Sequence, residues 1–317
     1  MKPLSPFLLI LAATLAAKPP PNPLEPELLT ITNGTLTLGI EKSMGASITH
    51  LTWKSLDQKN IVNIHDPGRL IQQSYYAGKR LDRLKDGQHK AWSPWSWNPI
   101  QGGGVGSWAK VTRFEKQKDN TLLFSETTPK LWDMHDEEAQ AVMHQWTTFE
   151  PGFTNVAVIK NRIICNRDLN DPWGPAALNP QEVPACYFTR NFDTFKTYLG
   201  EEKWRLETQP PGPPWGRTTS PRHAMACFEK SGQGVAIFSP SATSWNFGPH
   251  GQGSSTDPTA GPCTHFAPVA RVNLGPKSTL TYRYWLIVGT EKEITTSLDL
   301  LWKKYATERF SLTNPKK

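Results

Sequence analysis

Hydrophobic and polar residues alternate along much of this chain, and short apolar runs are closed by Gly, Pro, Asn or Asp. Both patterns are typical of β-strands, because successive side chains of a strand point to opposite sides. Asn33 and Gly34 join the first two expected strands as a tight hairpin turn. We expect strands over residues 29–33, 35–40, 46–54, 69–76, 108–115, 121–126, 143–150, 154–165, 183–189, 223–228, 234–239, 265–273 and 280–288.

One segment near the C-terminus has a helical period instead. Ile294, Leu298, Leu301, Trp302 and Tyr305 are spaced so that they fall on one side of a helix. We expect this apolar side to pack on the rest of the fold. Many strands and a single late helix favour an all-β fold, a large antiparallel β-sandwich with one C-terminal helix.

The first residues predict export. An apolar run over residues 7–15 follows Lys2 and ends in small residues at Ala16 and Ala17, which suits cleavage of a signal peptide. The run is too short to span a bilayer, although a retained membrane anchor is the alternative. We expect a secreted protein, extracellular or periplasmic, with a signal peptide over 1–17, a Pro-rich leader over 18–28 and a single domain over 29–317.

Composition and charge narrow the class of protein. The 13 Trp, 13 Phe and 7 Tyr can build a large core, while 28 Pro and 23 Gly indicate many turns. The formal charge of +7 is spread along the chain without a basic cluster, so nucleic-acid binding is not expected. Sequences typical of serine hydrolases, HExxH metalloproteases and P-loop proteins do not occur.

Cysteine spacing bears on disulfides and metals. Cys165, Cys186, Cys227 and Cys263 in an exported chain predict up to two disulfides, with three possible pairings. Their wide spacing argues against zinc, whose ligands come in close pairs. The acidic run 133–138 could hold a hard cation, but a solvated acidic loop is favoured because regular ligand spacing is absent. We expect no metal and no cofactor.

The segment 68–104 combines amide and aromatic side chains in a way that suits a sugar. A sugar ring has apolar C–H faces that stack on aromatic rings, and hydroxyl groups that amides can satisfy without burying a charge. An aromatic hairpin that only packs in the core is the alternative. The expected substrate-binding residues here are Arg69, Gln72, Gln73, Tyr75, Trp95, Trp97, Asn98 and Gln101, with Trp92 as a further stacking ring.

The order of elements resembles the galactose mutarotase-like superfamily, whose fold is a large antiparallel β-sandwich that binds sugars on a concave sheet. Aldose epimerases of this superfamily pair a carboxylate base with a histidine acid. Gln101 stands where they carry one histidine, and Glu182 or Ala185 falls near the place of the other, which makes the epimerase reaction less expected than the fold. The resembling pieces are the hairpin over 29–40, Gly45-Ala46-Ser47-Ile48, Asn63, the strand over 68–76, Ile100-Gln101-Gly102-Gly103, Asn179-Pro180-Gln181-Glu182 and Tyr187-Phe188.

Three residues are the candidate catalytic groups. Glu182 enters an apolar strand from a Pro/Asn turn, and partial burial would raise its pKa toward an acid–base range. His144 shares one strand face with Trp146, a predicted substrate contact, if Met143 faces the core. Tyr76 is a candidate base or acid for β-elimination on a uronic acid, if nearby cations lower its pKa. Two further histidines, at 250 and 265, flank a Gly/Ser-rich loop that could close over a ligand.

These features predict a secreted carbohydrate-active enzyme that degrades a polysaccharide, as a glycoside hydrolase or a polysaccharide lyase. A hydrolase would need a second carboxylate roughly 5 to 10 Å from Glu182, and a lyase would need a Tyr or His beside a group that neutralises the sugar carboxylate. The alternative is a non-catalytic glycan-binding protein, and an aldose 1-epimerase-like enzyme stands third. We expect a monomer with a polysaccharide or oligosaccharide substrate, no nucleic-acid partner and no membrane after signal cleavage.

Overall fold

The structure is a computed structural model that describes residues 27–251, 255–258 and 260–315. The predicted signal peptide, residues 1–17, and residues 18–26 of the predicted leader lie outside the described residues. The first strand, β1 (Leu28–Thr32), begins one residue before the predicted start of the domain. No helix among the described residues is long and apolar enough to cross a membrane.

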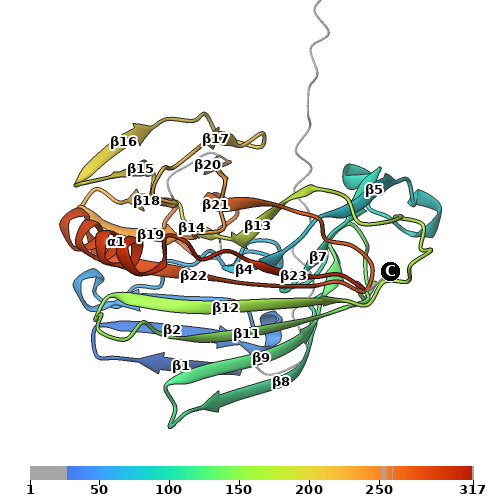
Figure 1. The fold of residues 1–317 in the computed structure, drawn as a ribbon, viewed down its shortest axis with the longest axis horizontal. Coiled ribbons are helices and arrows are strands. Elements are labelled where there is room, and N and C mark those ends of the chain that lie inside the picture. The colour runs from blue at the N-terminus through green and yellow to red at the C-terminus, as the bar shows by residue number, and fades with distance from the viewer. Residues whose placement is uncertain (1–26, 252–254, 259, 316–317) are drawn as a thin grey trace, which may run out of the picture.

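Two large antiparallel sheets lie face to face and form the body of the molecule (Figure 1). The eight-stranded sheet has the order β10 (Lys130–Leu131), β7 (Pro99–Ile100), β4 (Gln72–Ser74), β13 (Asn179–Ala185), β21 (Cys263–Val272), β20 (Ser244–His250) and β17 (Gly216–Thr218), with β14 (Tyr187–Thr189) on β21. The ten-stranded sheet has the order β16 (Lys203–Glu207), β15 (Thr194–Gly200), β18 (Ala224–Phe228), β19 (Gln233–Phe238), β22 (Thr279–Thr290), β12 (Val156–Cys165), β11 (Ala141–Phe149), β9 (Leu122–Thr128) and β8 (Lys110–Gln117), with β23 (Ser311–Thr313) on β22.

Smaller elements complete the described fold. A three-stranded sheet is formed by β1, β2 (Leu36–Glu41) and β3 (Ile48–Trp53), and a two-stranded sheet by β5 (Ala77–Leu81) and β6 (Trp95–Trp97). Short 3-10 turns lie at Lys42–Met44, Lys54–Leu56, Leu84–Asp86 and Lys90–Trp92.

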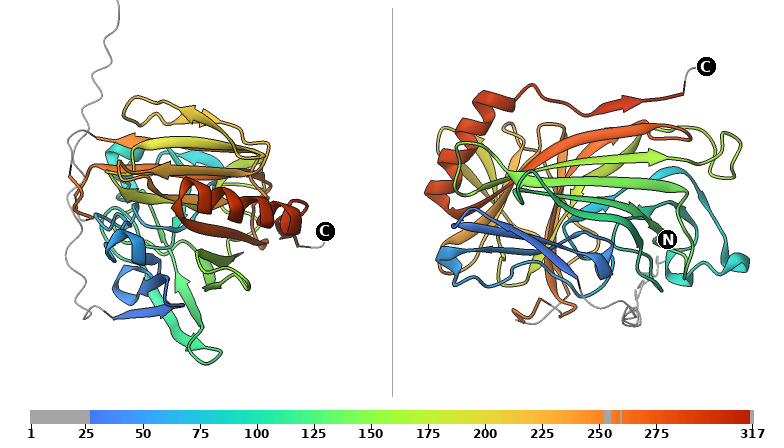
Figure 2. Two further views of the ribbon diagram at one scale, coloured as in Figure 1. Left: turned by 90° about the vertical axis from the view of Figure 1, so that its left-hand side faces the viewer. Right: turned by 90° about the horizontal axis from the view of Figure 1, so that it is seen from below.

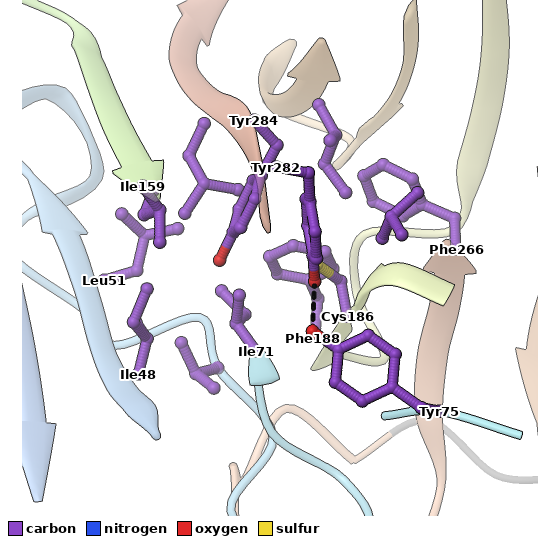
Figure 3. Close-up of a cluster of buried hydrophobic side chains, with 14 of the residues drawn as sticks. Ile48, Leu51, Ile71, Tyr75, Ile159, Cys186, Phe188, Phe266, Tyr282 and Tyr284 are labelled. Carbon is purple, nitrogen blue, oxygen red and sulfur yellow. Dashed lines mark hydrogen bonds between the residues drawn. The ribbon is translucent and has the colours of Figure 1, made fainter. Parts of the chain in front are cut away.

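The core fills the space between the two large sheets. Along β12, Ile159 and Ile163 are fully buried, whereas Lys160 and Arg162 lie on the other side of the strand and are half-buried. This alternation is the period-2 pattern that the sequence shows. Figure 3 shows Tyr75 from the β4–β5 connection meeting Tyr282 of β22, with their hydroxyl oxygens 3.4 Å apart.

The C-terminal helix α1 (Glu291–Tyr305) covers part of the outer side of the ten-stranded sheet (Figure 2). It begins with a capping box in which the Thr290 hydroxyl accepts from the Glu293 amide and the Glu293 carboxylate accepts from the Thr290 amide. Ile294, Leu298 and Leu301 are buried against the sheet, as the apolar stripe predicted. The predicted fold class, an antiparallel all-β sandwich with a C-terminal helix, is confirmed.

The predicted disulfides are wrong. All four cysteines are free, buried thiols, and they belong to separate places: β12, the turn between β13 and β14, β18 and β21. In the core a free cysteine packs as a small apolar side chain, which explains its position without a covalent partner. Burial raises the pKa of Cys165 to about 11 and that of Cys263 to about 12, so both stay protonated and poorly reactive.

Candidate functional site

Glu182 lies on the outer face of the eight-stranded sheet, near its middle. It is paired with Val269 of β21 on one side and with Ser74 of β4 on the other. The next residue along β13, Val183, belongs to the core, so the Glu182 side chain points away from it. Glu182 is only 8% exposed, so its carboxylate is largely covered by neighbouring residues.

His265 of β21 lies on the same outer face and meets Glu182. Its Nε2 is 3.4 Å from Oε1 of Glu182, and it has no hydrogen-bond partner. Its Nδ1 is 2.9 Å from the carbonyl oxygen of Cys186, which can only accept, so Nδ1 carries a proton. A proton placed between Nε2 and the Glu182 carboxyl would give both groups a hydrogen-bond partner. This is the arrangement of an acid–base pair.

Aromatic rings enclose the His265 imidazole. Tyr187, its cross-strand partner on β14, stacks on it with ring centroids 4.3 Å apart at 27°. Trp215, which directly precedes β17, contacts the same imidazole at 4.6 Å. These contacts fix the ring and exclude water from it, which strengthens its electrostatic interaction with Glu182. The sequence suggested only that His265 borders a loop; its contact with Glu182 comes from the pairing of β13 with β21.

Tyr76 is the one other predicted catalytic residue at this site. Its backbone is held by the Gln181 amide, which accepts from the Tyr76 N–H at 2.7 Å and donates to the Tyr76 carbonyl at 2.5 Å. Burial, and then the negative charge of Glu182, raise the pKa of Tyr76 far above its usual value. Tyr76 therefore stays protonated and can donate a hydrogen bond, but it is not the activated base that the sequence suggested.

An aromatic group extends from Tyr76 over the neighbouring surface. Trp95 lies 6.3 Å from Tyr76, Trp92 lies 5.2 Å from Trp95, and Trp132 lies 5.7 Å from Trp92, all edge to face. The four rings are half-buried and leave part of their area to solvent. Two of the predicted stacking rings, Trp92 and Trp95, thus belong to the aromatic group that continues from Tyr76. The third, Trp97, is 1% exposed and donates to the Ala139 carbonyl within the core.

The predicted sugar-binding amides are structural instead. Gln72, Gln73, Asn98 and Gln101 are at most 1% exposed, and both ends of each amide are hydrogen-bonded within the protein. Tyr75 is likewise fully buried, and its hydroxyl donates to Gln73. Short strands and close loops leave backbone groups without ladder partners in this region, and the amides satisfy them. The residue types were right for a sugar, but their side chains face inward.

His144 and Trp146 do not belong to this site. Both lie on the outer side of the ten-stranded sheet, across the core from Glu182, because Met143 between the sheets fixes the orientation of β11. His144 Nε2 is 3.0 Å from Glu126 Oε2, and Trp146 packs beside Lys160. The expectation that one cleft would unite His144 with Glu182 is therefore wrong.

The acidic run 133–138 is occupied by internal contacts. Asp133 accepts from Gln88, Asp136 pairs with Lys130, and Glu137 pairs with Arg83. Among the described residues no group of three or more His, Cys, Asp or Glu side chains is arranged to hold a metal ion.

Two hollows of the described part of the chain lie away from the Glu182–His265 pair. One, of about 790 Å³, is lined by residues of the ion pairs Arg83–Glu137 and Lys277–Asp168. The other, of about 990 Å³, is lined in part by the ends of β14 and β20. Neither is lined by Glu182 or His265, so the acid–base pair lies outside both.

No protein-family model matches the chain, and no curated protein matches its sequence. The structure is similar to an alpha-N-acetylgalactosaminidase from Bifidobacterium bifidum, with a TM-score of 0.48 and 9% identity over 87% of this chain and 38% of that one. It is similar to a heparan sulfate lyase from Pedobacter heparinus, with a TM-score of 0.42 and 9% identity over 84% of this chain and 37% of that one.

A third similar structure is a "putative aldose 1-epimerase" from Klebsiella pneumoniae, with a TM-score of 0.41 and 10% identity over 90% of this chain and 85% of that one. These similarities are similarities of backbone fold, and the activities given in the names belong to the named proteins.

Proposed function

We propose that this protein is a carbohydrate-active enzyme that transfers protons on a bound saccharide through Glu182 and His265. The observation that carries the proposal is their 3.4 Å approach on the outer face of a sheet, with Nε2 of His265 free of other partners. The aromatic group that starts at Tyr76, near Glu182, and continues through Trp95, Trp92 and Trp132 supports a saccharide, because the apolar faces of sugars stack on such rings.

The geometry favours a reaction at a hemiacetal, the reducing end of a sugar. Ring opening removes a proton from the anomeric hydroxyl and adds one to the ring oxygen, and both oxygens are bonded to the same carbon. An acid and a base in contact with one another suit two such neighbouring atoms. The absence of histidines at the two epimerase positions is a weaker argument against this reaction, because His265 of β21 brings an imidazole to Glu182.

Hydrolysis and Tyr-based elimination are less supported. Hydrolysis uses two carboxylates separated by about 5 to 10 Å, whereas the charged group that meets Glu182 among the described residues is a histidine and not a second carboxylate. Elimination by a tyrosine base needs a lowered pKa, whereas the pKa of Tyr76 is raised.

A second candidate function is degradation of a polysaccharide by β-elimination, with Glu182 and His265 as the proton-transfer pair. The specific observation in its favour is the length of the aromatic group, which continues from Tyr76 through three tryptophans and can contact more than one sugar unit. A glycan-binding protein without turnover would use the same rings.

The test is a panel of free aldoses and neutral and acidic polysaccharides with the purified chain. Exchange between anomers is measured by NMR, new double bonds by ultraviolet absorbance and new reducing ends by colorimetry. We expect faster anomeric exchange with at least one sugar, and its loss in Glu182→Gln. Glu126→Gln is the matched control, since Glu126 forms the other close Glu–His contact, on the far sheet.

Full activity of Glu182→Gln, or no turnover of any sugar, would overturn the proposed enzyme. New double bonds without anomeric exchange would show that the reaction is elimination, and new reducing ends without anomeric exchange would show that it is hydrolysis. Export is part of the same proposal, and N-terminal sequencing of the product from a secreting host is expected to begin after Ala17. An uncleaved product that stays with the cells would contradict export.

A further inference from the structure

Two basic side chains border the Glu182–His265 pair and have no role in the proton transfer. Arg69, in the loop that leads into β4, pairs through Nε with Asp66 at 3.2 Å and donates from Nη1 to the Gly261 carbonyl. These two contacts hold the guanidinium in one orientation through Nε and Nη1, and among the described residues no side chain or carbonyl accepts from its Nη2. The Arg69 side chain is 19% exposed, so a ligand can reach it.

A hydrogen bond and the strand register place Arg69 close to His250. Arg69 donates to the Gly261 carbonyl, and Cys263, two residues further along the chain, is the cross-strand partner of His250. Burial, and then the positive charge of Arg69, lower the pKa of His250. Tyr187 stacks on the His265 imidazole, and His250 meets Trp215, which also contacts that imidazole. Arg69 therefore stands among the residues that surround the acid–base pair.

His250 is the second basic group. It lies on β20, where Gly248 is the cross-strand partner of His265, so His250 is two residues further along the same outer face. Its Nδ1 is buried and has no hydrogen-bond partner. Burial, and then the nearby Arg69 and His265, lower the pKa of His250 to about 4. An anion at this place would offset these unfavourable charges and give the imidazole a partner.

We infer that the saccharide bound at Glu182 and His265 is acidic, and that its anionic group is recognised by Arg69 with His250. This inference rests on the proposed function and names its substrate class. A guanidinium binds a planar carboxylate through directed hydrogen bonds, and it binds a sulfate ester in the same way. A neutral sugar could offer hydroxyl groups to Nη2 and to the His250 ring, but it would not offset the positive charge of Arg69. The anionic group is thus either a uronate carboxylate or a sulfate.

The test compares acids with their neutral counterparts. Binding of D-galacturonate, D-galactose and D-galactose 6-sulfate to the full chain is measured by calorimetry at low and high salt, together with anomeric exchange by NMR. We expect one of the two anionic sugars to bind about 10- to 100-fold more tightly than galactose, which is the effect of one charged hydrogen bond. High salt should reduce that preference.

Variants locate the preference. Arg69→Gln should abolish the preference for the anionic sugar over galactose, while Arg69→Lys should restore part of that preference. Arg113→Gln is the matched control, because Arg113 lies on β8 of the far sheet and its removal changes net charge equally. If Arg69→Gln fails to fold, the inference is tested with His250→Gln, which should weaken the preference for the anionic sugar, and with the salt dependence of that preference in the wild type.

Equal affinity for acidic and neutral sugars, or an unchanged preference in Arg69→Gln, would overturn the inference. Failure of the two proposals can be told apart. Turnover of neutral sugars that depends on Glu182, without a preference for acids, contradicts acid recognition and leaves the enzyme standing. Binding of acids that depends on Arg69, without any turnover, contradicts the enzyme and supports recognition.

Discussion

Gln181 is joined to Tyr76 by two hydrogen bonds, one to the backbone N–H and one to the backbone carbonyl. The side chain thus replaces the ladder partner that Tyr76 lacks, and it positions the tyrosine next to Glu182. Gln181→Ala should lower the free energy of unfolding by about 2 to 4 kcal/mol, since two buried backbone groups lose their partners. Urea titration measures the effect, with Gln117→Ala as control, because the half-buried Gln117 at the end of β8 donates to a side chain, Glu115, and not to the backbone. An effect no larger than that of the control would contradict the role of Gln181.

Tyr76→Phe should reduce anomeric exchange by about 10- to 100-fold, the effect of one hydrogen bond to a charged group. The alkaline side of the pH–rate profile should keep its shape, because burial and Glu182 raise the pKa of Tyr76 beyond the range in which it would titrate. Rates of both proteins from pH 5 to about 10 test this. An alkaline limb that vanishes in the variant would mean that Tyr76 is the base.

His250 should make the fold sensitive to mild acid. Its folded pKa of about 4 lies below the ordinary value of 6.5, so the unfolded chain binds the proton more readily. Stability is then complete above pH 6.5 and falls as the pH drops toward 4, by at most about 3 kcal/mol. Urea unfolding at pH 6.5 and at pH 4 measures this loss of stability, and the loss should be smaller in His250→Gln. The exposed His135→Gln is the control, and equal losses in wild type and His250→Gln would contradict the prediction.

Glu150 anchors α1 on the ten-stranded sheet. Burial would raise the pKa of this carboxylate, but hydrogen bonds from Lys304, Tyr305 and Trp285 outweigh it and lower the pKa. Its stabilising effect is therefore present at neutral pH and is lost as the pH falls through the lowered value. Glu150→Gln should cost about 1 to 3 kcal/mol at neutral pH and leave sugar binding unchanged.

The control for α1 is Glu291→Gln, whose exposed ion pair with Lys196 should be worth less than about 1 kcal/mol. Equal losses in the two variants, or altered sugar binding in Glu150→Gln, would show that the anchor is misassigned.

Reductant should not change the thermal unfolding temperature, because all four cysteines are free thiols. Titration with a thiol reagent should find four reactive groups after denaturation and almost none before, since burial raises the thiol pKa values. Unfolding at a lower temperature in reductant, together with fewer than four titratable thiols, would show that the protein contains a disulfide.

Local pattern was enough for the element types. Alternation predicted most core strands, and the stripe from Ile294 to Tyr305 predicted α1, because side-chain period depends only on the backbone geometry of a few residues. Strand β20 was missed, since Gly248 and Pro249 made it look like a loop. Its pairing with β21 and β17 overrides that weak local preference. The start of β13 was missed for the same reason, at Asn179 and Pro180.

The sequence by itself determined that this is an antiparallel β fold with a terminal helix, and it singled out Glu182 and Tyr76 as neighbours of an aromatic surface. Only the tertiary structure decided which side chains face that surface. It turned the glutamines and Trp97 inward, put His144 on the far sheet and brought His265 to Glu182. The physical reason is that sheet pairing joins strands far apart in the chain, and its register, which sets the face of every side chain, depends on the whole fold.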